Sequence, residues 1–140
     1  IIRGLVGSEM CIRDRIKVAL GGHAAEELFY GKDKVTTGAT SDFSQVYAIA
    51  RQMVLNCGFS AVVGKINVDE RYMSATTMRL VDMEIKRIVD ECYDEVMKLL
   101  RANKEKLEQL KDILIDQEIV DGDVVYEMVA SCHVPPTRKK

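Results

Sequence analysis

Asp42 is the residue of this chain whose setting most favours chemistry. It follows the small residues Thr36-Thr37-Gly38-Ala39 and opens a predicted helix. A helix N-terminus favours the ionised form of a carboxylate, and a short side chain on a rigid helix is aimed with little loss of entropy. The loop before it is small enough to pass close to a metal site or a substrate strand. Taken alone, however, an acid in a first helical turn is most often only a helix-start residue.

Three other residues invite a functional interpretation, and each has a structural alternative. His23 is a lone histidine after Gly22, a setting that favours a core or surface histidine over a metal ligand. Glu26 and Glu27 are paired acids whose plain interpretation is the polar face of an amphipathic helix. The chain contains no His-Glu-x-x-His motif and no phosphate-binding loop, so we predict neither a catalytic base nor a nucleotide site within it.

The composition is that of one globular domain. Of 140 residues, 47% are apolar and 30% charged, and the net charge of −2 predicts no nucleic-acid partner. No apolar run approaches the roughly 18 residues of a membrane span. Cys57, Cys92 and Cys132 are far apart and form no Cys-x-x-Cys pair, which favours reduced core thiols over disulfides or a cysteine zinc site.

Hydrophobic spacing predicts helices almost throughout. The first runs from Ile16 to Tyr30, stops at Gly31, and contains Gly21-Gly22, which a helix tolerates where another backbone must approach closely. Its broad apolar face comprises Val18, Leu20, Ala24, Ala25, Leu28 and Phe29. The second helix runs from an N-cap at Thr40 or Ser41 to about Asn56. Its apolar positions are Phe43, Val46, Tyr47, Ala50, Met53 and Val54.

The strongest periodic signal lies further on, after an irregular stretch in which residues 65–69 alternate as a brief edge strand would. A long helix is predicted from Ser74 to about Ala102, with i,i+4 ion pairs Asp82–Lys86 and Asp94–Lys98. Its predicted buried stripe comprises Met78, Val81, Ile85, Ile88, Cys92, Val96 and Leu99. A further helix follows a break near Asn103, and Asp121 is predicted to cap a last one, Asp123–Ser131.

Residues 1–15 are predicted not to be native. Leu5 to Arg15 reads as the translation of a transposon-end adaptor used in DNA sequencing libraries, and the alternative is a natural N-terminal segment. It is too short and too charged for a signal peptide. On this interpretation Ile16 is the first natural residue of the chain.

Several blocks in order resemble the peptidase domain of the FtsH family, the membrane-anchored ATP-dependent zinc metalloproteases. They are LGGHAAEELFYG, VTTGATSD, ARQMV, CGFS, VDMEIKRIVDECY, NKEKLEQL and EIVDG, and they extend from Ile16 to about Met128. The resemblance implies a mainly α fold, a bundle of about five helices with one short irregular or β segment. Residues 16–132 would be the C-terminal part of the peptidase domain, and residues 133–140 a disordered tail.

The resemblance also implies roles for particular residues. Asp42 matches the third zinc ligand of the family, whereas the other two ligands and the general base come from a His-Glu-x-x-His helix that this chain lacks. Glu26 could orient a ligating histidine from outside the zinc shell, and Glu27 is the weaker candidate. The chain departs from the family at His23, where arginine is usual, and in a shortened link from Val63 to Tyr72, which leaves the local shape of the cleft rim open.

For the parent protein the resemblance implies a membrane anchor, an ATPase domain that binds ATP and Mg²⁺, and a homo- or hetero-hexameric ring. This ring would feed unfolded or membrane proteins to zinc sites at the bacterial plasma membrane, the mitochondrial inner membrane or the plastid thylakoid. Two alternatives stay open: an inactive FtsH-like paralogue acting as a hexamer scaffold, and a free-standing helical adaptor. Asp42 argues against the scaffold, which has no need of a ligand.

Overall fold

The computed structural model describes residues 8–34, 36–65, 67 and 69–135 and is built almost entirely of helices. Five α-helices lie in the described ranges, with three short 3-10 turns, η1 to η3, so the predicted mainly α fold is confirmed. Their bounds are α2 Ser8–Tyr30, η1 Lys32–Lys34, η2 Thr37–Ala39, α3 Thr40–Leu55, η3 Glu70–Tyr72, α4 Ala75–Ala102, α5 Lys104–Gln117 and α6 Gly122–Ala130. The chain divides into two compact units, residues 1–96 and 97–140.

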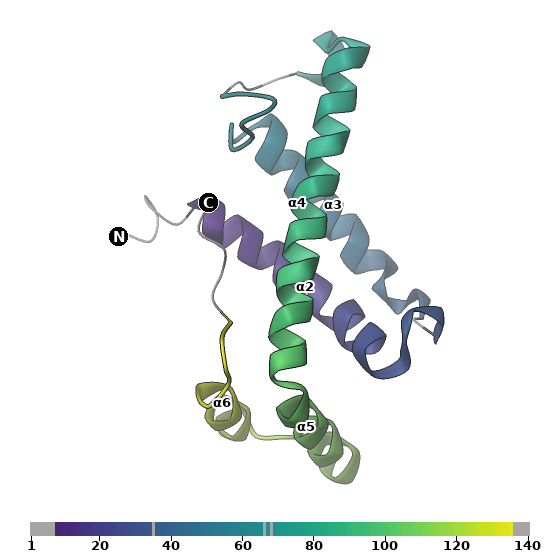
Figure 1. Ribbon diagram of the computed structural model, residues 1–140, viewed down its shortest axis with the longest axis vertical. Coiled ribbons are helices and arrows are strands. Elements are labelled where there is room, and N and C mark those ends of the chain that lie inside the picture. Colours follow the sequence, from purple (N-terminus) through teal and green to yellow (C-terminus); the bar gives the residue numbers. More distant parts are fainter. Residues whose placement is uncertain (1–7, 35, 66, 68, 136–140) are drawn as a thin grey trace. The chain divides into compact units, whose positions relative to one another are not determined.

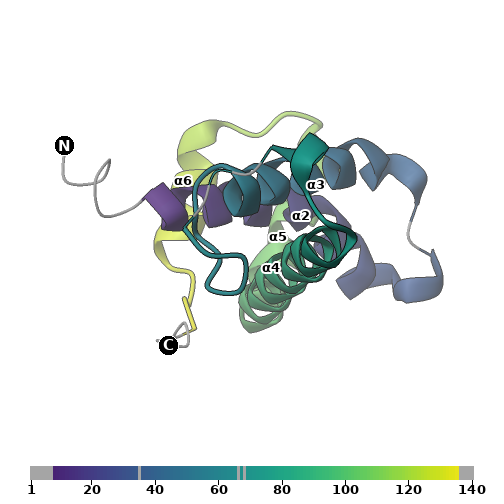
Figure 2. The ribbon, with the colours of Figure 1, turned by 90° about the horizontal axis from the view of Figure 1, so that it is seen from above.

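In the first unit, α2 and α3 pack against each other, and the part of α4 up to Val96 crosses both (Figure 1). A view nearly along α4 shows the three helices side by side (Figure 2). Their shared core consists of Ile16, Leu20, Val46, Ile49, Ala50, Met53, Val54, Leu55, Val81, Ile85, Ile88 and Cys92. This burial of apolar surface is the main force that fixes the three helices.

Helix α2 begins at Ser8, eight residues before its predicted start. It ends at Tyr30, as predicted, and is followed by Gly31, whose φ of +83° favours glycine. Ile12 packs against the core, and Arg13 pairs with α4. An adaptor origin for residues 1–15 stays a prediction, to be checked against the uninterrupted gene. The prediction for Val18 was wrong: its side chain is 81% exposed, because α2 buries the narrower stripe that contains Ile16 and Leu20.

The predicted close approach of another backbone to Gly21-Gly22 is not observed among the described residues. A Cβ at either glycine would have nothing within 4 Å, so no backbone approaches them there. On α3, Phe43 and Tyr47 are 42% and 47% exposed, again contrary to the predicted apolar face. The side of α3 that carries Val46 and Met53 supplies the core instead.

Helix α4 is capped by Ser74, whose Oγ accepts a hydrogen bond from the backbone N of Thr77 at 3.2 Å. Five of the seven predicted stripe residues are buried, but Met78 and Leu99 are 46% and 38% exposed. The period gives the direction of the stripe, whereas its length depends on how far the packed partner helices reach. The predicted ion pair Asp82–Lys86 is replaced, since Lys86 pairs with Asp90, and the described contacts include no ion pair between Asp94 and Lys98.

Between α3 and α4 the described residues include no named strand, only an isolated antiparallel bridge between Ser60 and Gly64. The predicted edge strand at 65–69 includes Ile66 and Val68, which lie outside the described residues. Arg51 ties this link to α3: its Nε donates to Glu70 Oε1 at 2.8 Å. The link between α3 and α4 is therefore anchored to the helix that carries Asp42.

In the second unit, the predicted break lies at Asn103, and Asp121 caps α6 by accepting a hydrogen bond from the backbone N of Asp123 at 3.2 Å. Neither α5 nor α6 contains a buried residue. His133 exchanges hydrogen bonds with Asn103, and the disordered tail at residues 133–140 stays a prediction. Residues 136–140 of that tail lie outside the described residues.

The four cysteines are free, as predicted for Cys57, Cys92 and Cys132. Only Cys92 lies in the core, whereas Cys57 is exposed and Cys132 half-buried, contrary to the prediction that all three are core thiols. Among the described residues, none of the helices combines the length and apolarity that crossing a membrane requires.

Candidate functional site

Asp42 lies in the first turn of α3, as predicted, with a half-buried side chain. The predicted N-caps were wrong: the cap position is Ala39, which has no side-chain bond, because η2 runs directly into α3. Thr40 Oγ1 instead donates back to the carbonyl O of Thr37 at 2.7 Å. The carboxylate of Asp42 makes no hydrogen bond or ion pair with another described residue, so it is available to a ligand.

Glu26 fixes the loop that leads to Asp42. Its Oε2 accepts a hydrogen bond from the backbone N of Thr36 at 3.1 Å, and its carboxylate also accepts one from Thr36 Oγ1 at 3.1–3.2 Å. Thr36 Oγ1 in turn caps η2 by accepting a hydrogen bond from the backbone N of Gly38 at 3.4 Å. Helix α2 therefore holds the start of the loop at one end, and α3 presents Asp42 at the other.

His23 and Glu27 have structural surroundings. The His23 ring meets Phe43 edge to face with centroids 4.7 Å apart, and lies 5.9 Å from the ring of Tyr93. The hydroxyl of Tyr93 donates to Glu27 Oε2. His23 is thus a packed histidine, the expected alternative to a ligand, although its buried Nδ1 has no hydrogen-bond partner in the described structure. This cluster joins α2, α3 and α4 beside the turn that carries Asp42.

The described residues do not form a complete metal site. Within the described ranges, no three His, Cys, Asp or Glu side chains lie close enough together to hold an ion. A catalytic zinc site uses three protein ligands and an open position for water. The described residues therefore do not supply the three ligands of such a site.

Comparison with known proteins assigns the chain to a family. The model of peptidase family M41 matches residues 5–128. The chain belongs to peptidase family M41. It is similar to the ATP-dependent zinc metalloprotease FtsH 3 of Conexibacter woesei, with 42% identity over 135 residues that cover 89% of this chain and 18% of that protein.

Two other relatives are also named ATP-dependent zinc metalloproteases. The M41 chain is 38% identical over 136 residues to the ATP-dependent zinc metalloprotease FtsH of Thermobaculum terrenum. This alignment covers 87% of this chain and 21% of that protein. It is 35% identical over 130 residues to a chloroplastic ATP-dependent zinc metalloprotease FTSH of Medicago sativa, with 83% and 18% covered. The chain spans about a fifth of the length of these relatives. The predicted resemblance to the FtsH family is confirmed.

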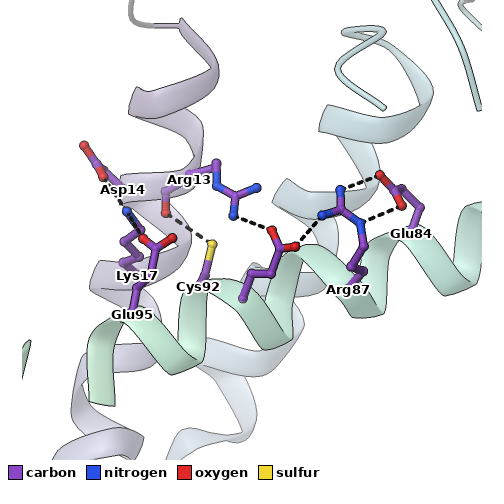
Figure 3. Close-up of polar contacts among 8 residues, drawn as sticks. Arg13, Asp14, Lys17, Glu84, Arg87, Cys92 and Glu95 are labelled. Carbon is purple, nitrogen blue, oxygen red and sulfur yellow. Dashed lines mark hydrogen bonds and ion pairs between the residues drawn. The ribbon is translucent and has the colours of Figure 1, made fainter. Parts of the chain in front are cut away.

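Sequence reasoning missed a second polar cluster in this M41 chain, which joins α4 to α2 (Figure 3). Glu84 is only 3% exposed, and its carboxylate accepts hydrogen bonds from Arg87 Nε at 2.9 Å and Nη2 at 2.6 Å. Arg87 Nη1 also donates to Glu91, which accepts another hydrogen bond from Arg13 at 2.9 Å. A charged residue on the apolar stripe, with an arginine three positions later, was the signal available in the sequence.

These contacts set the protonation of the buried groups. The hydrogen bonds from Arg87 hold the pKa of Glu84 below its ordinary value, against the opposing effect of burial. The same bonds raise the pKa of Arg87. Burial raises the pKa of the Cys92 thiol, whose Sγ lies 4.0 Å from the carbonyl O of Arg13. Glu84 is therefore ionised at neutral pH, and Cys92 is an unreactive core thiol.

Proposed function

We propose that this chain is the C-terminal part of the peptidase domain of an ATP-dependent zinc metalloendopeptidase, and that Asp42 supplies the third zinc ligand. The observation that carries the proposal is the half-buried Asp42 carboxylate in the first turn of α3, without a partner among the described residues, in an M41 chain. The other two ligands and the general base would come from a His-Glu-x-x-His helix outside this chain. When bound, zinc would polarise a peptide carbonyl and activate water.

Glu26 would act as a positioning residue for this ligand. Its two contacts with Thr36 fix the beginning of the loop, and the loop determines where α3 starts and hence where Asp42 points. Residues outside the first metal shell commonly orient ligands in this way. Glu27, which bonds Tyr93, has a packing role in this proposal.

For the whole protein we propose the FtsH arrangement: a membrane anchor, an ATPase domain that binds ATP and Mg²⁺, and a homo- or hetero-hexamer that degrades unfolded or membrane proteins. Support comes from the relatives, which are named ATP-dependent zinc metalloproteases and include proteins named as chloroplastic or chloroplastic/mitochondrial. A scaffold without protease activity is the less favoured candidate, because the Asp42 carboxylate would then have no metal ion to bind.

The test uses a full-length enzyme that carries this segment, with casein degradation measured beside phosphate release. Asp42→Ala is expected to abolish proteolysis and to spare ATP hydrolysis and assembly, because the loss of one of three ligands opens the zinc shell. Asp42→Asn should be nearly as damaging, since a neutral amide is a poor zinc ligand. His23→Arg, and Asp94→Asn at an exposed position of α4, should both retain activity. Casein degradation at the wild-type rate by the Asp42→Ala enzyme, with zinc bound, would show that Asp42 is only a helix-start residue.

The isolated chain should show no peptidase or ATPase activity and no tight zinc binding, because one carboxylate cannot hold the ion against water. Metal analysis after dialysis against a chelator checks this expectation. Zinc retained at one ion per chain would contradict it.

A further inference from the structure

The corner between α4 and α5 holds an asparagine, Asn103, whose side chain does not cap the helix that follows it. Asn103 occupies the N-cap position of α5, yet its carboxamide makes no cap bond, and the residue is only 8% exposed. Asparagine is among the best N-cap residues, and a buried carboxamide must find hydrogen-bond partners elsewhere. Two of the three hydrogen bonds that it makes lead to His133, thirty residues further along the chain.

The carboxamide of Asn103 forms two hydrogen bonds with the backbone of His133. Its Nδ2 donates to the carbonyl O of His133 at 2.7 Å, and its Oδ1 accepts a hydrogen bond from the backbone N of His133 at 2.7 Å. The second Nδ2 proton goes to the carbonyl O of Leu99 at 2.8 Å. Paired N–H···O bonds to a single residue reproduce the closely spaced pair of an antiparallel ladder. The carboxamide thus acts as a short piece of strand that recognises main chain rather than a particular side chain.

A second contact leads to the same segment. The ammonium of Lys106, in the first turn of α5, donates to Ser131 Oγ, and Ser131 Oγ donates to the carbonyl O of Met128 at 3.0 Å. No residue of α5 or α6 is fully buried, and their apolar residues are at most half-buried, so polar contacts have a large share in holding this segment. Polar contacts from one corner therefore fix the chain that follows α6.

We propose that residues 131–135 form a C-terminal strap that is closed by Asn103, a conformational device whose closed state depends on one carboxamide. Asparagine is required because it offers two donors and an acceptor in one plane. An ionised carboxylate of the same shape would face the carbonyl oxygens of Leu99 and His133 and repel them. A protonated carboxyl group, by contrast, supplies one donor and one acceptor, and could close the strap again.

The test measures amide exchange of His133 in the 140-residue chain by NMR or by mass spectrometry, with each variant compared with wild type at the same pH. Asn103→Ala should exchange about tenfold faster at every pH, as expected for the loss of two hydrogen bonds. Asn103→Asp should match it at about pH 7 and return towards wild-type protection near pH 4, where an aspartic acid becomes protonated. The control is Asn56→Ala, which removes an exposed carboxamide that donates to Asn67 at 3.2 Å and should not change exchange at His133.

Equal exchange of His133 in wild type and Asn103→Ala would overturn the proposal, as would wild-type protection in Asn103→Asp at neutral pH. If Asn103→Ala loses its helical circular dichroism, the decision passes to Asn103→Asp. Recovery of protection on acidification supports the strap, and failure to recover overturns it.

Discussion

Arg87 and Glu84 form a pair whose two members are buried to very different degrees, so removing one should not be equivalent to removing the other. The side chain of Glu84 is 4% exposed, whereas that of Arg87 is 42% exposed. Arg87→Met keeps the length of the side chain but leaves a buried carboxylate without its cation. Glu84→Gln leaves Arg87 in contact with water and with Glu91.

The magnitudes follow from what each change leaves behind. Breaking a buried ion pair by removing one partner costs about 3–5 kcal/mol. Ser60 still bonds Glu84, so we expect the lower end of that range, about 3 kcal/mol, for Arg87→Met. For Glu84→Gln the loss is that of charge-assisted hydrogen bonds to a solvated partner, about 1 kcal/mol. The double variant should recover part of the Arg87→Met loss, because it removes the unpaired charge.

The deficit of Arg87→Met should also depend on pH. In wild type the pKa of Glu84 is lowered, so its contribution to stability is fully present above the ordinary value of 4.5 and is lost as pH falls through the lower folded value. Without Arg87, burial dominates and raises the pKa of Glu84. Folded Arg87→Met then binds a proton at Glu84 more readily than the unfolded chain does. Its loss of stability relative to wild type should therefore become smaller as the pH falls from neutral towards the raised pKa of Glu84.

Urea unfolding followed by circular dichroism at 222 nm measures these differences. With an m-value of about 2 kcal/mol/M, the midpoint should fall by about 1.5 M for Arg87→Met and about 0.5 M for Glu84→Gln. Asp82→Asn, at an exposed position of α4, is the matched control and should stay near wild type. If Arg87→Met is no more destabilising than Glu84→Gln at neutral pH, the carboxylate of Glu84 is not held in the buried pair described above.

Three further outcomes are expected of the isolated chain. Gly21→Ala should raise the free energy of unfolding by about 0.5–1 kcal/mol in urea titrations, because a Cβ there meets nothing within 4 Å; a loss of stability would mean that something does close on this turn. In reaction with a thiol reagent, Cys57 should label at the rate of a free thiol, whereas Cys92 should label only on unfolding, and fast labelling of both would contradict the buried position of Cys92. Ile88→Ala should cost about 3 kcal/mol through the cavity that it leaves, whereas Met78→Ala should cost under about 0.5 kcal/mol; similar shifts in melting temperature would refute the difference in burial.

Local signals in the sequence predicted the helices well because each depends on residues close in the chain. Gly31 ends α2 through a positive φ, and Asp121 caps α6 through its own side chain, so neither needs knowledge of the fold. Some local predictions failed, such as the N-cap of α3, but most errors concern which apolar residues are buried. Met78 follows the period of the buried stripe and is still exposed, because the period does not reveal where the packed neighbours end.

The candidate site likewise has features that local sequence predicts and others that depend on the fold. The position of Asp42 in a first turn follows from local residues, and the M41 motifs identified its family. The contact of Glu26 with Thr36 could not be predicted, because it depends on how the intervening loop folds back. Glu84 was missed for the opposite reason: charged residues are assigned to solvent by default, and only the geometry shows Arg87 and Ser60 around a buried carboxylate.

The contact between Glu26 and Thr36 has a consequence for the order of folding. It spans only ten residues, whereas the pairs Arg13–Glu91 and Tyr93–Glu27 span 78 and 66. Loops of about ten residues close in roughly 10–100 ns, and the entropic cost of closure grows with length. The turn that presents Asp42 can therefore form on the α2–α3 hairpin before α4 docks. A fluorescence or exchange probe in this turn should gain protection earlier in refolding than one at Tyr93, so the geometry of the acid is established locally and only later enclosed.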